Sequence, residues 1–191
     1  MNNSRKIWYR LRGALLVPFY LFIVFRFSGK FDNHVVIIPL GSFLFGLGLL
    51  LRIWAQTHLH YRLKEHKKKL TLTGPYVYVR NPIYIGNTLI LASLTVLTGL
   101  LWFIPAMILA CAFTYHMTVL YEESHLKEKY GQGYVEFTRR VPRWLPRLRS
   151  LRREPSDSFQ KYLYPSILAE LHILLLLLPL FLKMIIMRMI R

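Results

Sequence analysis

The chain has 191 residues, of which 54% are apolar, and its formal net charge is +17. A strongly basic balance is also found in nucleic-acid-binding proteins, but here the basic residues lie between long apolar runs, as they do in integral membrane proteins. The composition therefore excludes a nucleic-acid partner and predicts an all-α membrane bundle of one domain, residues 1–191. The single cysteine, Cys111, lies inside an apolar run and excludes an intramolecular disulfide.

Two membrane spans are predicted in the first part of the chain. A span needs about 20 apolar residues to cross a hydrocarbon core of roughly 30 Å. The first candidate covers residues 11–27 and has a basic residue near each end. It follows a basic segment as in a signal sequence, but no small-residue cleavage site follows it, so we expect it to be retained. The second candidate covers residues 35–54 and contains three glycines that would let another helix approach closely.

The stretch from residue 81 to residue 121 contains no Asp, Glu, Lys or Arg. As one helix its 41 residues would reach roughly 60 Å, about twice the hydrocarbon core. We therefore expect two spans with a turn at residues 99–105, "GLLWFIP". Such a hairpin returns Glu122 to the side of the membrane on which Arg80 lies.

A last apolar run, within residues 160–188, predicts a fifth span. It carries Glu170, His172 and Lys183, and each central charge costs about 2.5–3.5 kcal/mol on insertion scales, whereas each Leu or Ile contributes roughly −0.5 kcal/mol. The sum favours insertion by a small margin because the charges lie away from the centre. An interfacial helix is the alternative.

The basic residues also predict an orientation. In this arrangement of spans, 21 of the 26 Lys and Arg residues lie on one side of the membrane. The positive-inside rule then places the amino terminus and both large loops in the cytoplasm, and the carboxyl terminus outside. We expect residues 67–69 and the Arg-rich stretch 139–153 to contact anionic lipid headgroups.

The two ends of the hairpin bring opposite charges to the cytoplasmic face. Arg80 lies in "GPYVYVRNPIYIG", residues 74–86, which enters the third span, and Glu122 and Glu123 end the fourth. Arg presents a planar fork that matches a carboxylate, and a Glu accepts from an ammonium or from ribose hydroxyls. A zwitterion would find partners for both of its charges here.

The remaining residues of this segment suit a binding site. Pro82 lacks the N–H that a first helical turn leaves unpaired, and Gly86, one turn on, leaves room for a ligand beside the helix. Tyr76 and Tyr84 supply apolar walls with polar tips. The alternative is that the Arg follows the positive-inside rule and the Glu pair is solvated at a helix end. Adjacent residues also point about 100° apart on a helix, so we expect only one Glu to face the bundle.

Three blocks resemble the membrane-integral methyltransferases related to isoprenylcysteine carboxyl methyltransferase and phospholipid methyltransferase. That family's pattern is GxYxxxRHPxYxG opening one span, a Glu-Glu pair ending the next, and a YGxxYxxYxxxVPxxLP tail. The blocks occur here in that order over about residues 70–147, the expected methyltransferase core. Their members are Gly74, Tyr76, Arg80, Asn81, Pro82, Tyr84 and Gly86, then Glu122 and Glu123, then Tyr130, Gly131, Tyr134, Phe137, Val141, Pro142, Leu145 and Pro146.

The resemblance implies about five helices, S-adenosylmethionine bound at the cytosolic membrane face, and methyl transfer to a lipophilic acceptor arriving from the bilayer. Arg80 and one of the two Glu residues would hold the amino-acid end of the cofactor, and the other motif residues would shape its pocket. Asn81 replaces the family's usual His. It keeps a donor and an acceptor, but it cannot titrate near neutral pH, so a proton-transfer role at that position is in doubt.

Several residues and functions stay open at this stage. His116 lies two turns before Glu123 and is a candidate base or cofactor contact, or a partner for a neighbouring helix. His58, His60 and His66 lack the acidic or Cys partners of a metal site, so we expect no metal. Glu170 and His172 are candidates for a substrate entrance. The alternative functions are a phospholipid N-methyltransferase, an NADPH-dependent enzyme resembling sterol reductases, and a non-catalytic lipid-binding protein. The pattern fixes neither the acceptor nor the oligomeric state.

Overall fold

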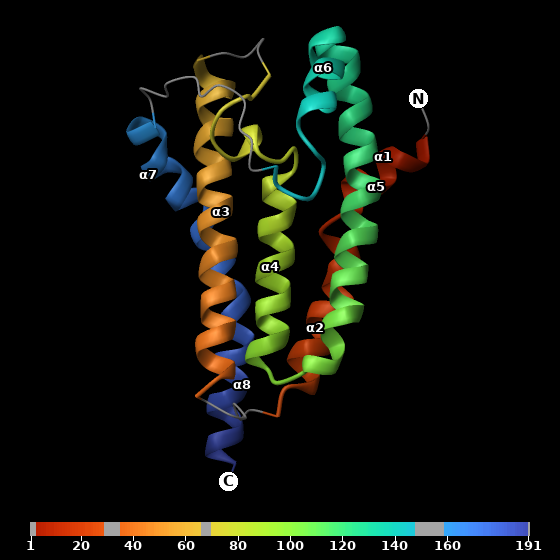
Figure 1. Ribbon diagram of the computed structural model, residues 1–191. Coiled ribbons are helices and arrows are strands. Elements are labelled where there is room, and N and C mark those ends of the chain that lie inside the picture. Colours follow the sequence, from red (N-terminus) through yellow and green to blue (C-terminus); the bar gives the residue numbers. More distant parts are fainter. Residues whose placement is uncertain (1–2, 29–34, 66–69, 148–158, 191) are drawn as a thin grey trace.

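A computed structural model describes residues 3–28, 35–65, 70–147 and 159–190, and within them every regular element is a helix. The expected all-α membrane bundle is therefore confirmed (Figure 1). The elements are α1 Asn3–Leu11, η1 Ala14–Leu16, α2 Val17–Arg26, α3 Ile37–Glu65, η2 Gly74–Val77, α4 Pro82–Leu97, η3 Leu101–Phe103, α5 Ile104–Tyr130, α6 Gln132–Arg140, α7 Phe159–Glu170, η4 Leu171–Leu177 and α8 Leu178–Met189.

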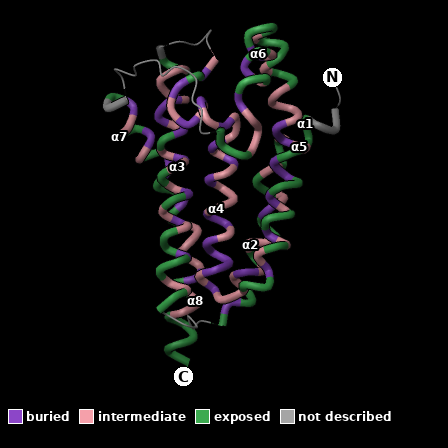
Figure 2. The backbone as a smooth tube through the Cα atoms, in the orientation of Figure 1, coloured by how far each residue is buried: buried purple, intermediate pink, exposed green. Residues whose placement is uncertain are grey.

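Three helical segments are long and apolar enough to cross a membrane: Ile37–Lys64, Leu101–Tyr130 and Lys161–Met189. Two shorter apolar helical segments, Ala14–Arg26 and Pro82–Leu97, complete the bundle. Large apolar side chains cover its outer faces, among them Phe25, Phe43 and Leu109, and Figure 2 shows these exposed turns along the outer helices. Because lipid tails solvate such side chains, this pattern is typical of a bundle within a bilayer.

The first apolar segment differs from the single helix expected over residues 11–27. α1 ends at Leu11, a short 3₁₀ turn follows, and α2 begins only at Val17. Gly13 lies at the break, where its low helix propensity favours an end, and Pro18 falls in the first turn of α2, where it is tolerated. α1 thus turns away from α2 at the upper end of the molecule (Figure 1), and it packs on α5 through Trp8 and Phe113.

The hairpin of residues 81–121 is confirmed, with its turn where the sequence predicts it. α4 ends at Leu97, and Gly99 adopts φ of 73°, a left-handed conformation that favours glycine. α5 then starts with Pro105 in its first turn. The chain consequently returns along α4, and the start of α4 and the end of α5 lie at the same end of the bundle (Figure 1).

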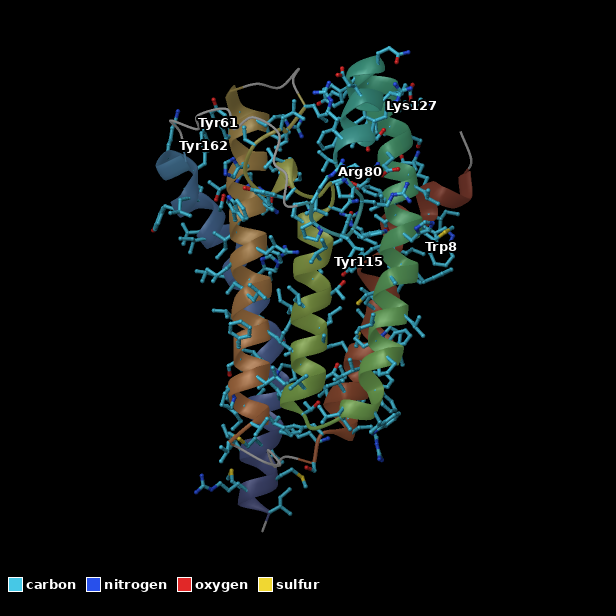
Figure 3. All side chains as sticks on the ribbon, viewed as in Figure 1. Trp8, Tyr61, Arg80, Tyr115, Lys127 and Tyr162 are labelled. Atoms are coloured by element: carbon cyan, nitrogen blue, oxygen red, sulfur yellow. The ribbon has the colours of Figure 1, made fainter. Side chains whose placement is uncertain are left out.

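The carboxyl-terminal segment, from α7 to α8, starts beside the upper part of α3 and runs to the lower end of the molecule (Figure 1). Tyr61 and Tyr162 bring ring centroids within 6.0 Å where α7 begins (Figure 3). Further down, Lys183 donates from Nζ to the carbonyls of Val24, at 2.8 Å, and Phe25, at 2.6 Å. A cation at a helix carboxyl end satisfies carbonyls that lack intrahelical partners, which lowers the cost of this Lys in an apolar segment.

Candidate active site

A cavity of about 670 Å³ lies at the upper end of the bundle, and unequal helix lengths create it. α3 has 29 residues and α5 has 27, but α4 between them has only 16. At 1.5 Å per residue, α4 is shorter than either neighbour by roughly 15 Å or more. Figure 1 shows α4 starting well below the upper ends of α3 and α5, with the η2 loop and the chain after α6 crossing above it.

Two segments far apart in the sequence meet beside the start of α4, next to the cavity. The backbone N–H of Arg80 donates to the carbonyl of Pro142 at 2.9 Å, and that of Arg147 donates to Tyr78 at 3.0 Å. The side-chain amide of Asn81 also donates to the carbonyl of Arg143, at 3.1 Å. The first and third motif blocks are therefore joined directly, and Asn81 helps to hold the tail in place.

The η2 loop depends on a close approach to α3. Gly74 adopts φ of 61°, and a Cβ placed there would lie 2.2 Å from the ring of His58. That His is buried and its Nδ1 lies 2.9 Å from Oγ1 of Thr73. Glycine at position 74 therefore meets both a conformational and a steric requirement, and it sets the path of the chain toward Arg80.

Glu123 holds two cations at the cavity wall. Its Oε1 lies 2.7 Å from Nη1 of Arg80, and Arg143 donates to both of its oxygens, from Nε at 3.0 Å and from Nη2 at 2.6 Å. This bidentate hydrogen bond raises the pKa of the Arg143 guanidinium. Arg80 thereby has a fixed orientation between the upper parts of α4 and α5 (Figure 3). Its Nε is buried and makes no hydrogen bond within the described part of the chain.

Glu122 has a different environment from its neighbour. It lines the cavity and accepts one hydrogen bond, from the Tyr84 hydroxyl at 2.8 Å. Within the described residues no Arg or Lys nitrogen lies within 4.0 Å of it. The ring of Tyr84 stacks on that of Tyr115 at a centroid distance of 4.7 Å, which fixes the phenol. Both carboxylates thus line the cavity, but Glu123 is paired with two cations and Glu122 makes no ion pair among the described residues.

Aromatic residues form much of the remaining wall, and they come from the loop, α5 and α6: Tyr76, Tyr121, Tyr134 and Phe137. Burial raises the pKa of Tyr134 to about 12, and burial likewise raises the pKa of Tyr76. Both phenols are therefore neutral at physiological pH and present rings with a hydroxyl that donates. Such walls suit a planar ring system with polar edges.

The structure brings most of the predicted site residues to this cavity. Its lining includes Tyr76, Arg80, Asn81, Pro82, Tyr84, Glu122 and Glu123. Gly86 and His116 are not among the lining residues. Gly86 faces α3, where a Cβ would lie 2.6 Å from Cγ of Arg52 and 2.8 Å from the carbonyl of Gly48. The room that Gly86 leaves is therefore filled by a neighbouring helix, and His116 is exposed on the outer face of α5.

Sequence reasoning missed several polar residues that the fold brings to the same space. Tyr9 and Arg12 come from the amino-terminal region, Arg52 and Arg62 from α3, and Asn87 from α4. Their chain positions gave no signal, because each lies outside the motif blocks or reads as an ordinary interfacial cation. Arg143 stands inside the tail block, between Pro142 and Trp144, and that position could have identified it.

The histidines considered for a metal site have other partners. His58 contacts Thr73, and Nδ1 of His60 lies 3.0 Å from Oγ of Ser166. His66 lies outside the described residues. In the part of the chain that the structure describes, no group of three or more His, Cys, Asp or Glu side chains could hold a metal ion.

Comparison with known proteins supports the methyltransferase resemblance. The family model for phospholipid methyltransferase matches residues 36–133. The chain is 27% identical over 147 residues to the cobalt-zinc-cadmium resistance protein CzcN of Cupriavidus metallidurans, covering 74% of this chain and 66% of that protein. It is 29% identical over 121 residues to the nickel-cobalt-cadmium resistance protein NccN of Alcaligenes xylosoxydans xylosoxydans, covering 61% and 55%.

A plant relative is similar over the same region. The protein-S-isoprenylcysteine O-methyltransferase B of Arabidopsis thaliana is 27% identical over 124 residues, covering 59% of this chain and 57% of that protein. No solved structure matches. The chain thus spans between about half and two thirds of the length of these curated relatives.

The fold is a helical membrane bundle with a polar, aromatic-walled cavity at one end, and the chain is similar to membrane methyltransferases. More narrowly, the chain belongs to the phospholipid methyltransferase family, whose model matches just over half of it.

Proposed function

We propose that this protein transfers a methyl group from S-adenosylmethionine to a lipophilic acceptor at the membrane interface. One observation carries the proposal: Arg80 and Glu122 line the same cavity, and Glu122 makes no ion pair within 4.0 Å among the described residues. A ligand that carries both a carboxylate and an ammonium would find partners for both charges.

The residues present fit the cofactor. The cavity volume of about 670 Å³ lies within the range of roughly 300–1,000 Å³ that is typical of small-molecule sites. Arg80 would bind the carboxylate of the amino-acid end, and Glu122 would bind its ammonium. Tyr76, Tyr121 and Tyr134 would pack against the adenosine. The Nε of Arg80 is buried and has no hydrogen-bond partner among the described residues. A small shift of the guanidinium toward a bound carboxylate would give this donor a partner, which agrees with the assignment.

The protein's contribution to the reaction would be orientation. When bound, S-adenosylmethionine supplies a methyl group on a sulfonium: the carbon–sulfur bond breaks with its electron pair going to sulfur, a lone pair of the acceptor forms the new bond to carbon, and any proton on that acceptor atom passes to water. Glu123 and Arg143 position Arg80, and Tyr84 positions Glu122. Fixing two reactants in line would remove much of the entropic barrier.

We also propose that the cavity opens toward the cytoplasm. The amino-terminal helix, the η2 loop and α6 lie at the cavity end of the bundle, and the carboxyl terminus lies at the other (Figure 1). The cavity end carries most of the basic residues, which the positive-inside rule associates with the cytoplasm. The cofactor would then enter from the cytoplasm, and the acceptor would enter from the bilayer.

Calorimetric binding of S-adenosylmethionine to the detergent-purified full chain tests this function, with NADPH titrated separately. We expect saturable binding of the methyl donor, and a loss of roughly tenfold or more in affinity for Arg80→Ala and for Glu122→Gln, because each removes one charge-assisted contact. Glu136→Gln is the matched control, since Glu136 is exposed on α6 and pairs only with Arg140 among the described residues.

Two results would contradict the proposal. Binding of NADPH in place of the methyl donor would move the protein to a reductase function. Absence of binding of either compound would favour a non-catalytic lipid-binding role.

A further inference from the structure

A second cavity adjoins the first and shares two lining residues with it. Its volume is about 360 Å³, and most of its lining is apolar. The apolar residues come from the α2 region, α4 and η4: Leu16, Val17, Ile90, Leu91, Ile173 and Leu176. The hydroxyl of Tyr20 closes one side by donating to the carbonyl of Leu176 at 2.8 Å. A cavity of this size and character fits an elongated apolar chain.

Two polar side chains stand between the cavities. Arg52 and Asn87 line both of them. Arg52 donates to Oδ1 of Asn87 and also makes a bidentate ion pair with Glu170, from Nε to Oε2 at 2.7 Å and from Nη2 to Oε1 at 3.1 Å. Glu170 comes from the end of α7, outside the segment that the family model matches. The exposed fractions of the Arg52 and Glu170 side chains are 11% and 1%.

We call the place where the two cavities meet, at Arg52 and Asn87, the junction. The ion pair between Arg52 and Glu170 determines which charge a ligand can carry there. The carboxylate of Glu170 occupies two of the five N–H donors of Arg52 and Asn87 occupies a third, and the Glu170 charge already balances that of the guanidinium. An anionic ligand would either displace Glu170 and leave a buried carboxylate without a partner, or add a second negative charge beside an ion pair that is already balanced, and both are unfavourable. A ligand with a neutral hydrogen-bonding end has no such penalty. The amide of Asn87 and the phenol of Tyr115 remain as groups that can meet it.

We propose that the second cavity binds a lipid-like acceptor whose reacting end is uncharged, such as a hydroxyl, a thiol or a neutral amine on a long apolar chain. The apolar chain lies among α2, α4 and η4, and its end reaches the junction at Asn87. Glu170 is a positioning residue that acts through Arg52 and sets this selectivity. The role of this lipid as methyl acceptor rests on the proposed methyl transfer, whereas its binding does not require the cofactor.

The test uses photoaffinity labelling of the full chain in lipid nanodiscs without cofactor. The two probes are a diazirine-bearing hexadecanol and a diazirine-bearing hexadecanesulfonate, which share an apolar chain and differ in charge at every accessible pH. Labelled positions are identified by mass spectrometry, and unlabelled hexadecanol serves as the competitor. We expect competable labelling of η4 and α4 by the alcohol, at least about tenfold above the sulfonate.

Variants test the role of the ion pair. Glu170→Gln frees the Arg52 fork, so sulfonate labelling of η4 and α4 should rise about tenfold or more relative to the alcohol. The double variant with Arg52→Gln and Glu170→Gln removes both charges and should keep the preference for the alcohol. If Glu170→Gln alone does not fold, the wild-type preference and the double variant still decide the matter. The midpoint of thermal unfolding in detergent, followed by circular dichroism, reports the fold of each variant.

Three results would overturn the inference: equal or stronger labelling of the wild type by the sulfonate, an unchanged preference in a folded Glu170→Gln variant, or labelling confined to lipid-facing positions such as Phe181. Each result is independent of whether the wild type binds the methyl donor, so failure of this inference and failure of the proposed function are distinguishable.

Discussion

Glu122 and Glu123 are neighbours in the chain, but they have different partners. Glu123 pairs with Arg80 and Arg143, whereas Glu122 accepts only from Tyr84 among the described residues. Successive helical residues point about 100° apart, so Glu123 contacts Arg143 of the tail segment, whereas Glu122 on the same cavity wall contacts Tyr84 of α4. We therefore assign Glu123 to positioning and Glu122 to ligand binding.

This division of roles predicts a non-additive pair of mutations. Glu123→Gln and Arg143→Ala should each lower the affinity for S-adenosylmethionine by about tenfold, because each loosens a charge-assisted network that fixes Arg80. The double variant should lose little more than either single variant, since both act through the same guanidinium. Calorimetry on the three variants measures the coupling.

Additive losses in that cycle would show that the two residues act independently. A loss in Arg143→Ala with none in Glu123→Gln would mean that Arg143 binds the ligand itself. Glu136→Gln again provides the control, because its carboxylate is exposed on α6.

The sequence predicted which residues meet at the cavity, but not which of them pair with one another. Arg80, Tyr84 and the Glu pair stand in a recognisable motif, so their convergence followed from the hairpin geometry. Which Glu faces the ligand depends on where Arg143 lies, and only the folded tail determines that position. Gly86 is expected from the sequence to leave room for a ligand, yet Gly48 and Arg52 of α3, which fill that room, lie more than 30 residues earlier in the chain.

At the level of elements, α3 and α4 pack closely through two glycines. A Cβ added to Gly48 would lie 2.8 Å from the carbonyl of Gly86, and one added to Gly86 would lie 2.8 Å from the carbonyl of Gly48. Small residues at such crossings let backbones approach in membrane bundles. The crossing also brings Arg52 against α4, where it reaches Asn87.

Gly86→Ala should therefore destabilise the bundle. The added methyl group meets a backbone carbonyl that cannot move aside, and overpacking of this kind typically costs about 1–3 kcal/mol. The measurement is the midpoint of thermal unfolding in detergent, followed by circular dichroism. Gly46→Ala is the matched control in α3, since a Cβ there meets nothing within 4 Å. Equal midpoints for the two variants would contradict a close α3–α4 crossing at Gly86.

Element boundaries were predictable where the sequence contains strong turn signals such as Gly and Pro. The uncharged length of residues 81–121 and the Gly–Pro turn fixed the hairpin. The break between α1 and α2 was not expected, because residues 11–27 read as one apolar run and a single Gly13 is a weak signal. The start of α4 at Pro82 agrees with the helix start expected there, whereas the pairing of the tail segment with residues 78–81 was not predicted.

Considered as a whole, the molecule has two unlike ends. The upper end combines the cavity, α1, α6 and most of the cations, and the lower end is dominated by the apolar carboxyl-terminal helix (Figure 1). This asymmetry links function to topology, because a water-soluble cofactor can reach the cavity only from the compartment on that side. The proposed reaction therefore requires the upper end to face the cytoplasm, in agreement with the positive-inside rule.

Cysteine labelling can measure this orientation directly. Cys111 is buried with an exposed fraction of 0% and is the only cysteine in the chain, so Cys111→Ala provides a background without thiols. Leu145→Cys marks the cavity end and Met189→Cys marks the opposite end, both at positions with an exposed fraction of 80%. In intact cells, a membrane-impermeant maleimide should label the Cys at position 189 and should label the Cys at 145 only after permeabilisation.

The reverse pattern would place the cavity outside the cell and would contradict cofactor entry from the cytoplasm, whereas labelling of both positions in intact cells would show a mixed orientation. Calorimetry on the same variants keeps the two questions separate. A variant that binds S-adenosylmethionine in detergent but shows the reversed labelling would retain the proposed site and refute only its placement, because ligand contacts at Arg80 and Glu122 do not depend on which compartment they face.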